Sequence, residues 1–491
     1  MKKIILLAFL VPTISLFARK IPIGRGNGFL SQVGMQGLRP GDTLTIREGT
    51  YMLGGEFRDL VGITLLNDRG IVNFGAGLRI GSLREVVFSG AGVPGLRYGL
   101  HFSRLAGNAF TVEAPCVGLK MLNCEYDSVQ GTILDVSKYF ITYNGNDSTL
   151  ALFRTVLANQ HLIRSGNFLV GSFDLIGTFH NVIDSIAFYN IIIDTTLTDG
   201  TEVSGTSIYR MSAHDWVIRG GTPNGTRDVG VFFTHGNGSV YNIYRSGGWG
   251  YLWRLWNVGL NGRAESYLYN CIDLGTVNYG TIDTRIDPSD TTTGSVKPFL
   301  RGGSMHVLNN TAGNKKDKVG YVSVLVVAGD FFPQNGYRLE VRNNLGFNNV
   351  ARYSTGILQI NTANPVTDTS NNLYVADAIA SGILSDTVNC FVRNGSAVID
   401  KGVPVMPVRT DIGGVSRPQF KNYDIGAREF KGHGEKIRRS DTGIPIDWSR
   451  IFRARYLAAL TLLSGIFVLL FIQRARKKKP RESSRYYSST R

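Results

Sequence analysis

The 491-residue sequence is poor in charged residues and has no long stretch rich in Ala, Leu, Glu and Lys. Charged residues make up 18% of it, below the roughly 25% of ordinary globular proteins. The missing helix-forming stretches argue against helices as the main element. Glycine is abundant instead, with 59 residues, and Asn and Thr are plentiful. These residues favour strands and turns.

The chain also lacks a basic body, although its net charge is +16. Residues 431–455 carry seven Lys/Arg and three Asp/Glu, residues 474–491 carry eight and one, and Lys2 and Lys3 add two more. Residues 19–430 therefore keep a net charge of only +3. Because a nucleic-acid-binding protein needs a basic face on its folded part, we expect no nucleic acid as a partner.

Both ends of the chain carry membrane signals. Residues 1–18 are typical of a secretory signal peptide, with two lysines, an apolar run and a final alanine. The eighteen uncharged residues 456–473 would span the membrane as one helix, and a basic cluster follows them. We predict a single-pass envelope protein, with residues 19–430 outside the cytoplasm, a basic linker at 431–455 and a cytoplasmic tail at 474–491. A retained N-terminal anchor and removal of the C-terminal helix after export are the alternatives.

Metal-ligand spacing is missing from the Cys and His residues, so we predict no metal site. In an exported chain the four cysteines could form disulfides. Cys116 and Cys124 lie eight residues apart and could pair across a turn, whereas Cys271 and Cys390 have no obvious partner.

Short apolar runs that end in asparagine recur along the body. The asparagines are Asn123, Asn190, Asn242, Asn270, Asn309, Asn343 and Asn371. From Asn190 onward they are 52, 28, 39, 34 and 28 residues apart, and the first gap fits two units, with the segment "DWVIRGG" midway. Such recurrence predicts a solenoid in which each coil buries its apolar face against its neighbours. Asparagine tolerates the left-handed backbone region, so stacked asparagines at one corner predict a ladder of amide hydrogen bonds.

Two segments resemble a known family. Residues 38–51, "LRPGDTLTIREGTY", look like the opening coil of right-handed parallel β-helix proteins of the pectate-lyase-like superfamily. Residues 411–430, "DIGGVSRPQFKNYDIGAREF", resemble the closing coil of secreted bacterial β-helix proteins, with Asp411, Gly414 and Arg417 at spacing three before the Asp-Ile-Gly-Ala-x-Glu pattern. The resemblance implies an all-β fold, a right-handed parallel β-helix over residues 19–430, to which we add one C-terminal transmembrane helix.

The run "GWGYLWRLW", residues 248–256, holds three of the five tryptophans. Side chains of a strand alternate between its faces. Trp249, Tyr251 and Trp253 then share the core face, because the other face carries Arg254, which is not expected to be buried alone. Arg254 and Trp256 are therefore predicted to point outward as a substrate-binding pair, with a guanidinium for a carboxylate and a ring for a sugar.

Other candidate groups gather in residues 214–263. A lyase needs a base for the proton next to a uronic carboxylate, and a cation that neutralises this carboxylate. The weak catalytic candidates are His214, Arg219, His235 and Arg245. We expect His235 and Arg245 one coil before the Arg254 and Trp256 pair.

The sequence leaves several function classes open. One is a protein that binds carbohydrate or a partner along one solenoid face, with no cofactor. Another is a polysaccharide lyase or related carbohydrate-active enzyme that acts on acidic glycans, for which the family resemblance implies calcium. A structural spacer is the third. Hydrolysis is disfavoured, because "THGNG" at 234–238 lacks the pair of aspartates that β-helix polygalacturonases have upstream.

Overall fold

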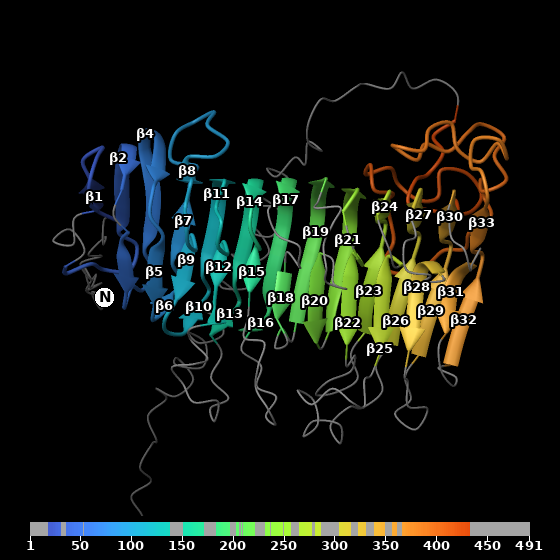
Figure 1. Ribbon diagram of the computed structural model, residues 1–491, viewed down its shortest axis with the longest axis horizontal. Coiled ribbons are helices and arrows are strands. Elements are labelled where there is room, and N and C mark those ends of the chain that lie inside the picture. The colour runs from blue at the N-terminus through green and yellow to red at the C-terminus, as the bar shows by residue number, and fades with distance from the viewer. Residues whose placement is uncertain are drawn as a thin grey trace, which may run out of the picture. The chain divides into compact units, whose positions relative to one another are not determined.

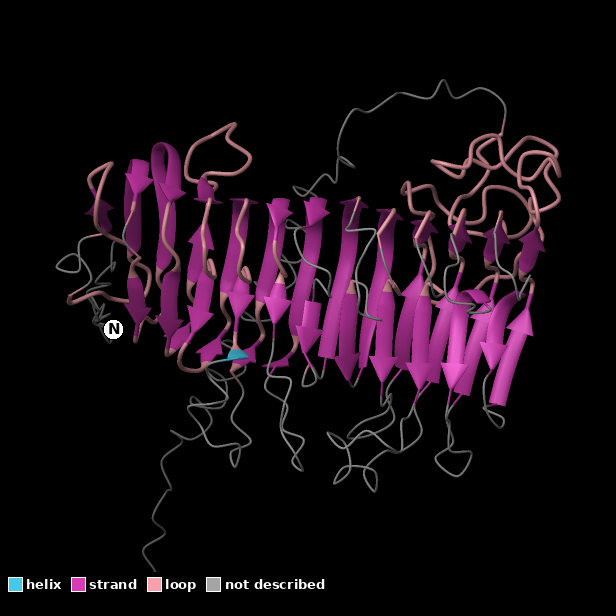
Figure 2. Cartoon of the chain, in the orientation of Figure 1, coloured by secondary structure: helices cyan, strands magenta, loops and turns pink. Residues whose placement is uncertain are grey.

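The computed structural model describes residues 18–30, 36–52, 54–137, 151–170, 183–196, 203–205, 208, 210–220, 231–235, 237–248, 250–256, 265–276, 280–285, 304–315, 323–329, 338–348, 356–360 and 366–432. It is built almost entirely from strands and loops, as the lack of helix-forming stretches predicts, with one short helical segment (Figure 2). The strands form three sheets, which we name A, B and C.

Sheet A has eighteen strands. They are β1 (Lys20–Gly24), β2 (Thr43–Tyr51), β4 (Thr64–Phe74), β7 (Val87–Ser89), β8 (Leu100–Ser103), β11 (Lys120–Asp127), β14 (Val156–Ser165), β17 (Ile186–Thr196), β19 (Arg210–Arg219), β21 (Asn237–Ser246), β23 (Glu265–Tyr269), β24 (Ile272–Leu274), β26 (Ser304–Leu308), β27 (Thr311–Gly313), β29 (Arg338–Arg342), β30 (Leu345–Phe347), β32 (Val366–Ser370) and β33 (Leu373–Val375).

Sheets B and C have eleven and four strands. Sheet B contains β3 (Glu56–Arg58), β5 (Leu78–Gly81), β9 (Phe110–Val112), β12 (Leu134–Asp135), β15 (Leu169–Val170), β18 (Val203–Gly205), β20 (Phe232–His235), β22 (Trp253–Trp256), β25 (Ile282–Arg285), β28 (Ser323–Gly329) and β31 (Gly356–Ile360). Sheet C contains β6 (Leu83–Arg84), β10 (Cys116–Val117), β13 (Leu152–Phe153) and β16 (Ile183–Asp184).

Neighbouring strands in all three sheets run parallel, and each one pairs with strands one coil earlier and one coil later. The strands of sheets A and B therefore follow one another side by side along the stack (Figure 1). This arrangement is the parallel β-helix that the sequence predicted. Because crossovers between parallel strands of one sheet are right-handed in nearly all proteins, we expect the right-handed winding as well.

One corner of every coil from β11 onward is made by a residue in the left-handed region. The nine residues are Asn123, Asn159, Asn190, Asp215, Asn242, Asn270, Asn309, Asn343 and Asn371, with φ between 51° and 59°. Strand register places them opposite one another in successive coils, and we call them the ladder. All seven asparagines predicted from the sequence belong to it, and the structure adds Asn159 and Asp215. A left-handed residue turns the strand, so sheet A bends into two facets at the ladder.

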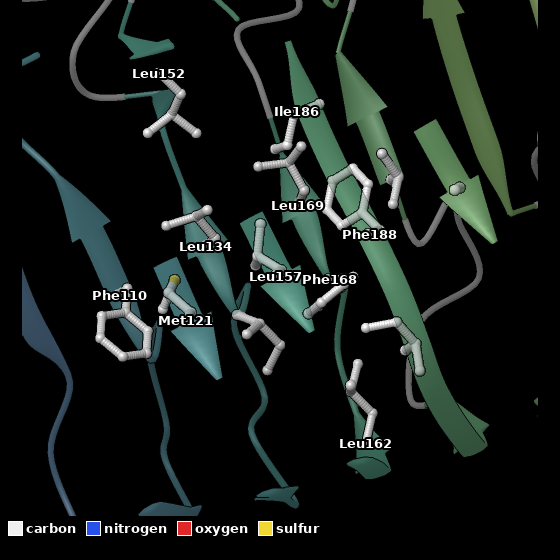
Figure 3. Close-up of a cluster of buried hydrophobic side chains, with 14 of the residues drawn as sticks. Phe110, Met121, Leu134, Leu152, Leu157, Leu162, Phe168, Leu169, Ile186 and Phe188 are labelled. Atoms are coloured by element: carbon white, nitrogen blue, oxygen red, sulfur yellow. The ribbon is translucent and has the colours of Figure 1, made fainter. Parts of the chain in front are cut away.

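The interior of the coils is apolar and rich in rings. Along β11, Met121, Cys124 and Tyr126 are buried, so the inward alternation skips one residue at the ladder position Asn123. Side chains from successive coils stack on one another inside, among them Phe110, Met121, Leu134, Leu157 and Phe188 (Figure 3). Each coil therefore buries its apolar face against its neighbours, as expected for a solenoid.

Residues 376–432, which we call the cap, contain no strand and do not form the closing coil that the sequence predicted. They lie across the last coils, beside β24, β27, β30 and β33 (Figure 1). The side chains of Asn270, Asn309, Asn343 and Asn371 donate to the carbonyls of Thr410, Asp424, Val403 and Lys401. The motif residues also bind one another within the cap: buried Arg417 donates to Glu429 at 3.0 Å and to the Asp424 and Gly426 carbonyls.

All four cysteines are buried and free, so the predicted pairing of Cys116 with Cys124 is wrong. Cys116 lies in sheet C and Cys124 in sheet A, on different sides of the coil. Burial raises the pKa of the Cys116 thiol to about 11.

The described part of the chain contains no helix of the length and apolarity that crossing a membrane requires. The predicted transmembrane span 456–473, the linker beyond Gly432, the tail and residues 1–17 of the predicted signal peptide lie outside it.

Candidate functional site

Arg245 is buried, contrary to the prediction that it is an exposed candidate. Its side chain is 2% exposed and donates to both carboxylate oxygens of Asp273, one coil later, at 2.6 and 3.1 Å. It also donates to the carbonyls of Gly250 and Tyr251, which fixes the turn into β22. Lys315 binds the same carboxylate at 2.6 Å. Burial would raise the pKa of Asp273, but these two cations outweigh it and hold the pKa well below its usual range.

The run at 250–256 follows the predicted alternation within β22. Trp253 and Leu255 are buried, and Arg254 points outward, where its Nε donates to Asp283 at 2.9 Å. Leu252, directly before the strand, is buried as well. Arg254 is 13% exposed and lies over the rings of Phe233 and Tyr251, so its guanidinium is already engaged.

The remaining members of this predicted site are placed by their backbones alone. His235 and Trp256 pair in register on β20 and β22, so His235 does lie one coil before Trp256. Their side chains, together with Trp249, fall outside what the structure describes. Arg245 lies on sheet A rather than beside them on sheet B, so the predicted constellation of these residues is not assembled in one place.

His214 belongs to a stack of rings on the outside of sheet A. It lies between Tyr189 and Tyr241, with ring centroids at 5.3 and 4.6 Å and interplanar angles of 8° and 10°, and Tyr269 continues the stack. Both faces of His214 and of Tyr241 are therefore covered by neighbouring rings and cannot hold a sugar ring. The Nδ1 of His214 also contacts the carboxylate of Asp215 at 2.7 Å. His214 is thus held in place by both contacts.

Arg219 ends a row of ionisable side chains that crosses five coils on the other facet of sheet A. We call His101, Glu125, His161, Asp194 and Arg219 the polar row. Glu125 lies between His101 and His161, at 3.6 and 2.9 Å. Asp194 lies between His161 and Arg219, at 3.0 and 3.1 Å.

His161 is the centre of the polar row. Its two ring nitrogens contact two different carboxylates, and both can donate only from an imidazolium. The hydrogen bond that His161 donates to Glu125 raises the pKa of His161, although partial burial works against it. The same bond lowers the pKa of Glu125. An imidazolium held in this way can bind and orient polar groups, but it cannot act as a general base.

The loop between β7 and β8 brings an aromatic residue to the polar row. The ring of Tyr98 lies 5.5 Å from that of His161, and the Tyr98 carbonyl contacts Nε2 of His101 at 3.0 Å. The Tyr98 hydroxyl is buried without a hydrogen-bond partner. Burial raises the pKa of Tyr98, and the charges of Glu125 and Asp194 act in the same direction.

Sequence reasoning identified only Arg219 in this row. A usable signal exists: all row residues except His101 stand two or four positions after a ladder residue, as Glu125 follows Asn123 and Asp194 follows Asn190. No group of His, Cys, Asp or Glu within the described residues could hold a metal ion.

No protein-family model matches the sequence, and neither does any curated protein. Among solved structures, the pectate lyase Pel9A matches with a TM-score of 0.42 and 12% identity, over 84% of this chain and 98% of the lyase. A likeness of this size carries no argument about a reaction or a ligand. The assignment as a parallel β-helix rests on the strand pairing.

Proposed function

We propose that this protein binds carbohydrate outside the cytoplasm, without chemistry on it, along the facet of sheet A that carries the polar row. The proposal keeps the predicted transmembrane span 456–473 as its anchor. The row offers carboxylates, an imidazolium and a guanidinium at half-exposed positions on successive coils. A carbohydrate site needs a few polar groups in fixed positions beside an aromatic ring, and Tyr98 supplies the ring.

The observation that carries the proposal is the unpaired Tyr98 hydroxyl. Buried polar atoms in native proteins nearly always have a hydrogen-bond partner, so an orphan atom beside two carboxylates marks a place for a water or a ligand group. A sugar hydroxyl can both donate and accept there.

Binding is favoured over lyase chemistry because the candidate catalytic groups are already engaged. Arg245 is inside the coil with Asp273, and Arg254 is paired with Asp283. His214 is stacked and bound to Asp215, and His161 uses both ring nitrogens. A lyase base must be able to accept a proton, and His161, with both ring nitrogens bound to carboxylates, is not arranged for that.

The test uses the full-length protein in detergent with a panel of neutral and acidic polysaccharides, with and without calcium. Binding is measured by affinity electrophoresis, and ultraviolet absorbance reports unsaturated uronate products. We expect binding without product, and a loss of roughly tenfold in affinity for Glu125→Gln. Glu85→Gln, which changes an exposed carboxylate on another face, is the matched control. Unsaturated products would establish the lyase alternative instead. If the Arg254→Ala, Trp256→Ala double variant loses binding and Glu125→Gln does not, the glycan site lies on sheet B, which carries these two residues.

The envelope location has its own test. A cytoplasm-active reporter fused after Arg491 should be active, and alkaline phosphatase fused at the same place should be inactive. Phosphatase activity of the second fusion would contradict the predicted topology.

A further inference from the structure

The ladder binds peptide backbone at both of its ends. Near the N-terminal end, Asn123 donates to the Arg97 carbonyl at 3.0 Å in the loop between β7 and β8. At the other end, four rungs donate to carbonyls of the cap at 2.5 to 3.0 Å. Two segments far apart in the sequence thus use the same surface in the same way.

Asn343 makes this contact in both directions. Its Nδ2 donates to the Val403 carbonyl at 2.7 Å, and its Oδ1 accepts from the Val403 N–H at 3.0 Å. The side-chain amide therefore pairs with the N–H and the carbonyl of one residue, as a neighbouring strand would. Such pairing recognises the main chain and ignores its side chains.

Four rungs between these covered ends are bonded differently. Asn190 donates to Asn159 at 2.6 Å, and Asn242 donates to Asp215 at 3.1 Å. Within the part of the chain that the structure describes, the hydrogen bonds of these four side chains run only to one another and to His214. We call Asn159, Asn190, Asp215 and Asn242 the open rungs. They are half-buried, and they line up across β14, β17, β19 and β21.

Hydrogen-bonding capacity is left over at the open rungs. The Oδ1 of Asn242 is buried without a partner, because the amide of the next rung, Asn270, donates to the Thr410 carbonyl of the cap. Asp215 is an acceptor only, so it gives Asn190 Oδ1 no donor from the following coil. The Oδ1 atoms of Asn190 and Asn242 thus lack hydrogen-bond donors. The Oδ1 of Asn343 would lack one in the same way if the Val403 N–H were absent.

We infer that the open rungs are a docking surface for an extended segment of another polypeptide, read through its main chain. The occupant follows from the two covered ends, where main-chain N–H and carbonyl groups fill the same positions on the same ladder. Rungs are about 4.8 Å apart, so four of them span about 14 Å, which four to five extended residues cover at 3.2–3.4 Å each. This surface is separate from the polar row and does not depend on carbohydrate binding there.

A fluorescent peptide with the cap sequence 398–412 is the probe, because this segment supplies three of the carbonyls that bind the ladder in the same chain. Added to the full-length protein in detergent, it should bind, as measured by fluorescence anisotropy. A scrambled peptide of equal composition should bind about as well, and a peptide N-methylated at alternate non-proline residues should not, because it lacks N–H donors.

The variant Asn159→Gly, Asn190→Gly removes two open rungs while glycine keeps the left-handed backbone. We expect its affinity for the probe to fall roughly tenfold or more, with its melting temperature and cap unchanged. Glu125→Gln is the matched control from the polar row and should bind the probe normally. If this control alone loses the peptide, the polar row is the peptide site and the inference fails.

Three other results would overturn the inference: no peptide binding by the unchanged protein, equal binding of the N-methylated peptide, or loss of glycan instead of peptide in the double glycine variant. The last result would assign the open rungs to a carbohydrate. Failure of the glycan panel leaves the peptide result unaffected, so the two proposals can fail separately.

Discussion

The middle coils and the last coils of this solenoid make the same corner in two ways. In β17, β19 and β21 the residue after the ladder is Ile191, Trp216 or Ile243, and each side chain is buried among apolar neighbours. In the last coils the corresponding residue is another asparagine: Asn310, Asn344 and Asn372. Their amides donate to carbonyls of the preceding coil, and their Oδ1 atoms accept from the backbone N–H of the residue at the same position one coil earlier.

The comparison shows that a corner has two separate requirements, one for the ladder residue and one for the inward residue that follows it. A left-handed residue is needed in both regions, since all ladder residues keep positive φ. The inward neighbour is free to vary, provided that it either buries apolar area or pairs every polar atom. The last coils use the second solution, and the cap covers their outer side.

The largest effect should come from the apolar version of the corner. Trp216 is 1% exposed and contacts the rings of Phe168, Phe188 and Phe232. Trp216→Ala should destabilise the middle coils by about 3–5 kcal/mol, because it removes a large buried side chain and leaves a cavity. Hydrogen exchange should locate the loss in β17 to β21, since each coil contacts only its neighbours. Uniform loss over the whole chain would mean that the solenoid unfolds as one unit.

The amide version of the corner should respond somewhat less. Asn344→Ala removes the bonds to Val307 O, to Asn372 and from the Asn310 N–H. The orphaned backbone groups should cost about 2–3 kcal/mol. Denaturant unfolding should show the loss, with hydrogen exchange rising in β26 to β33 and unchanged in β11 to β17. A neutral Asn344→Ala would show that apolar packing, and not the amide pairs, holds the last coils.

A smaller and pH-dependent effect is expected outside the middle coils, at His161. A histidine with a raised folded-state pKa contributes stability that is complete below its unfolded pKa, about 6.5, and lost as pH rises through the folded value. Glu125 and Asp194 face the ring, and the pKa of Glu125 is lowered and that of Tyr98 raised, so neither of these two groups titrates over that range. The stability difference between the unchanged protein and His161→Gln should therefore shrink as the pH rises above about 6.5. A difference that is constant over this range would contradict the doubly bonded imidazolium.

Asp215→Asn should have the smallest effect, and it should be stabilising. An amide at this rung can donate to Asn190 Oδ1 and still accept from Asn242, so the ladder becomes continuous. We expect a gain of about 0.5–1 kcal/mol, measured as a rise in the denaturation midpoint. A loss of stability would show that the carboxylate is needed by its partner His214, at 2.7 Å.

The sequence predicts the features of the fold that depend on residues close together in the chain. Asparagine after an apolar run reports a left-handed corner directly, so seven ladder positions were found without the structure. Asp215 was not predicted as a rung because the recurring pattern was defined by asparagine, although aspartate tolerates the same backbone. The cap was mistaken for a coil because its aspartate, glycine and arginine residues satisfy one another, and that pattern does not reveal which surface the segment covers.

The candidate site was less predictable because its partners come from other coils. The alternation of side chains along a strand was enough to predict that Trp253 points inward and Arg254 outward, because both residues belong to the same strand. The burial of Arg245 depends on Asp273 and Lys315, which are 28 and 70 residues further along the chain. The polar row likewise joins residues 24 to 36 apart, which single-strand patterns do not connect.

The position of the cap has a mechanical consequence. Gly432 ends a segment that is fastened to the side of the stack, by bonds to Asn270, Asn309, Asn343 and Asn371 in four consecutive coils. A tether attached beyond Gly432 would therefore load four coils at once and would not unwind the terminal coil first. Bonds that share a load fail at a higher force than bonds that open one after another. The C-terminal end of this solenoid is therefore held by four coils together and not by its last coil alone.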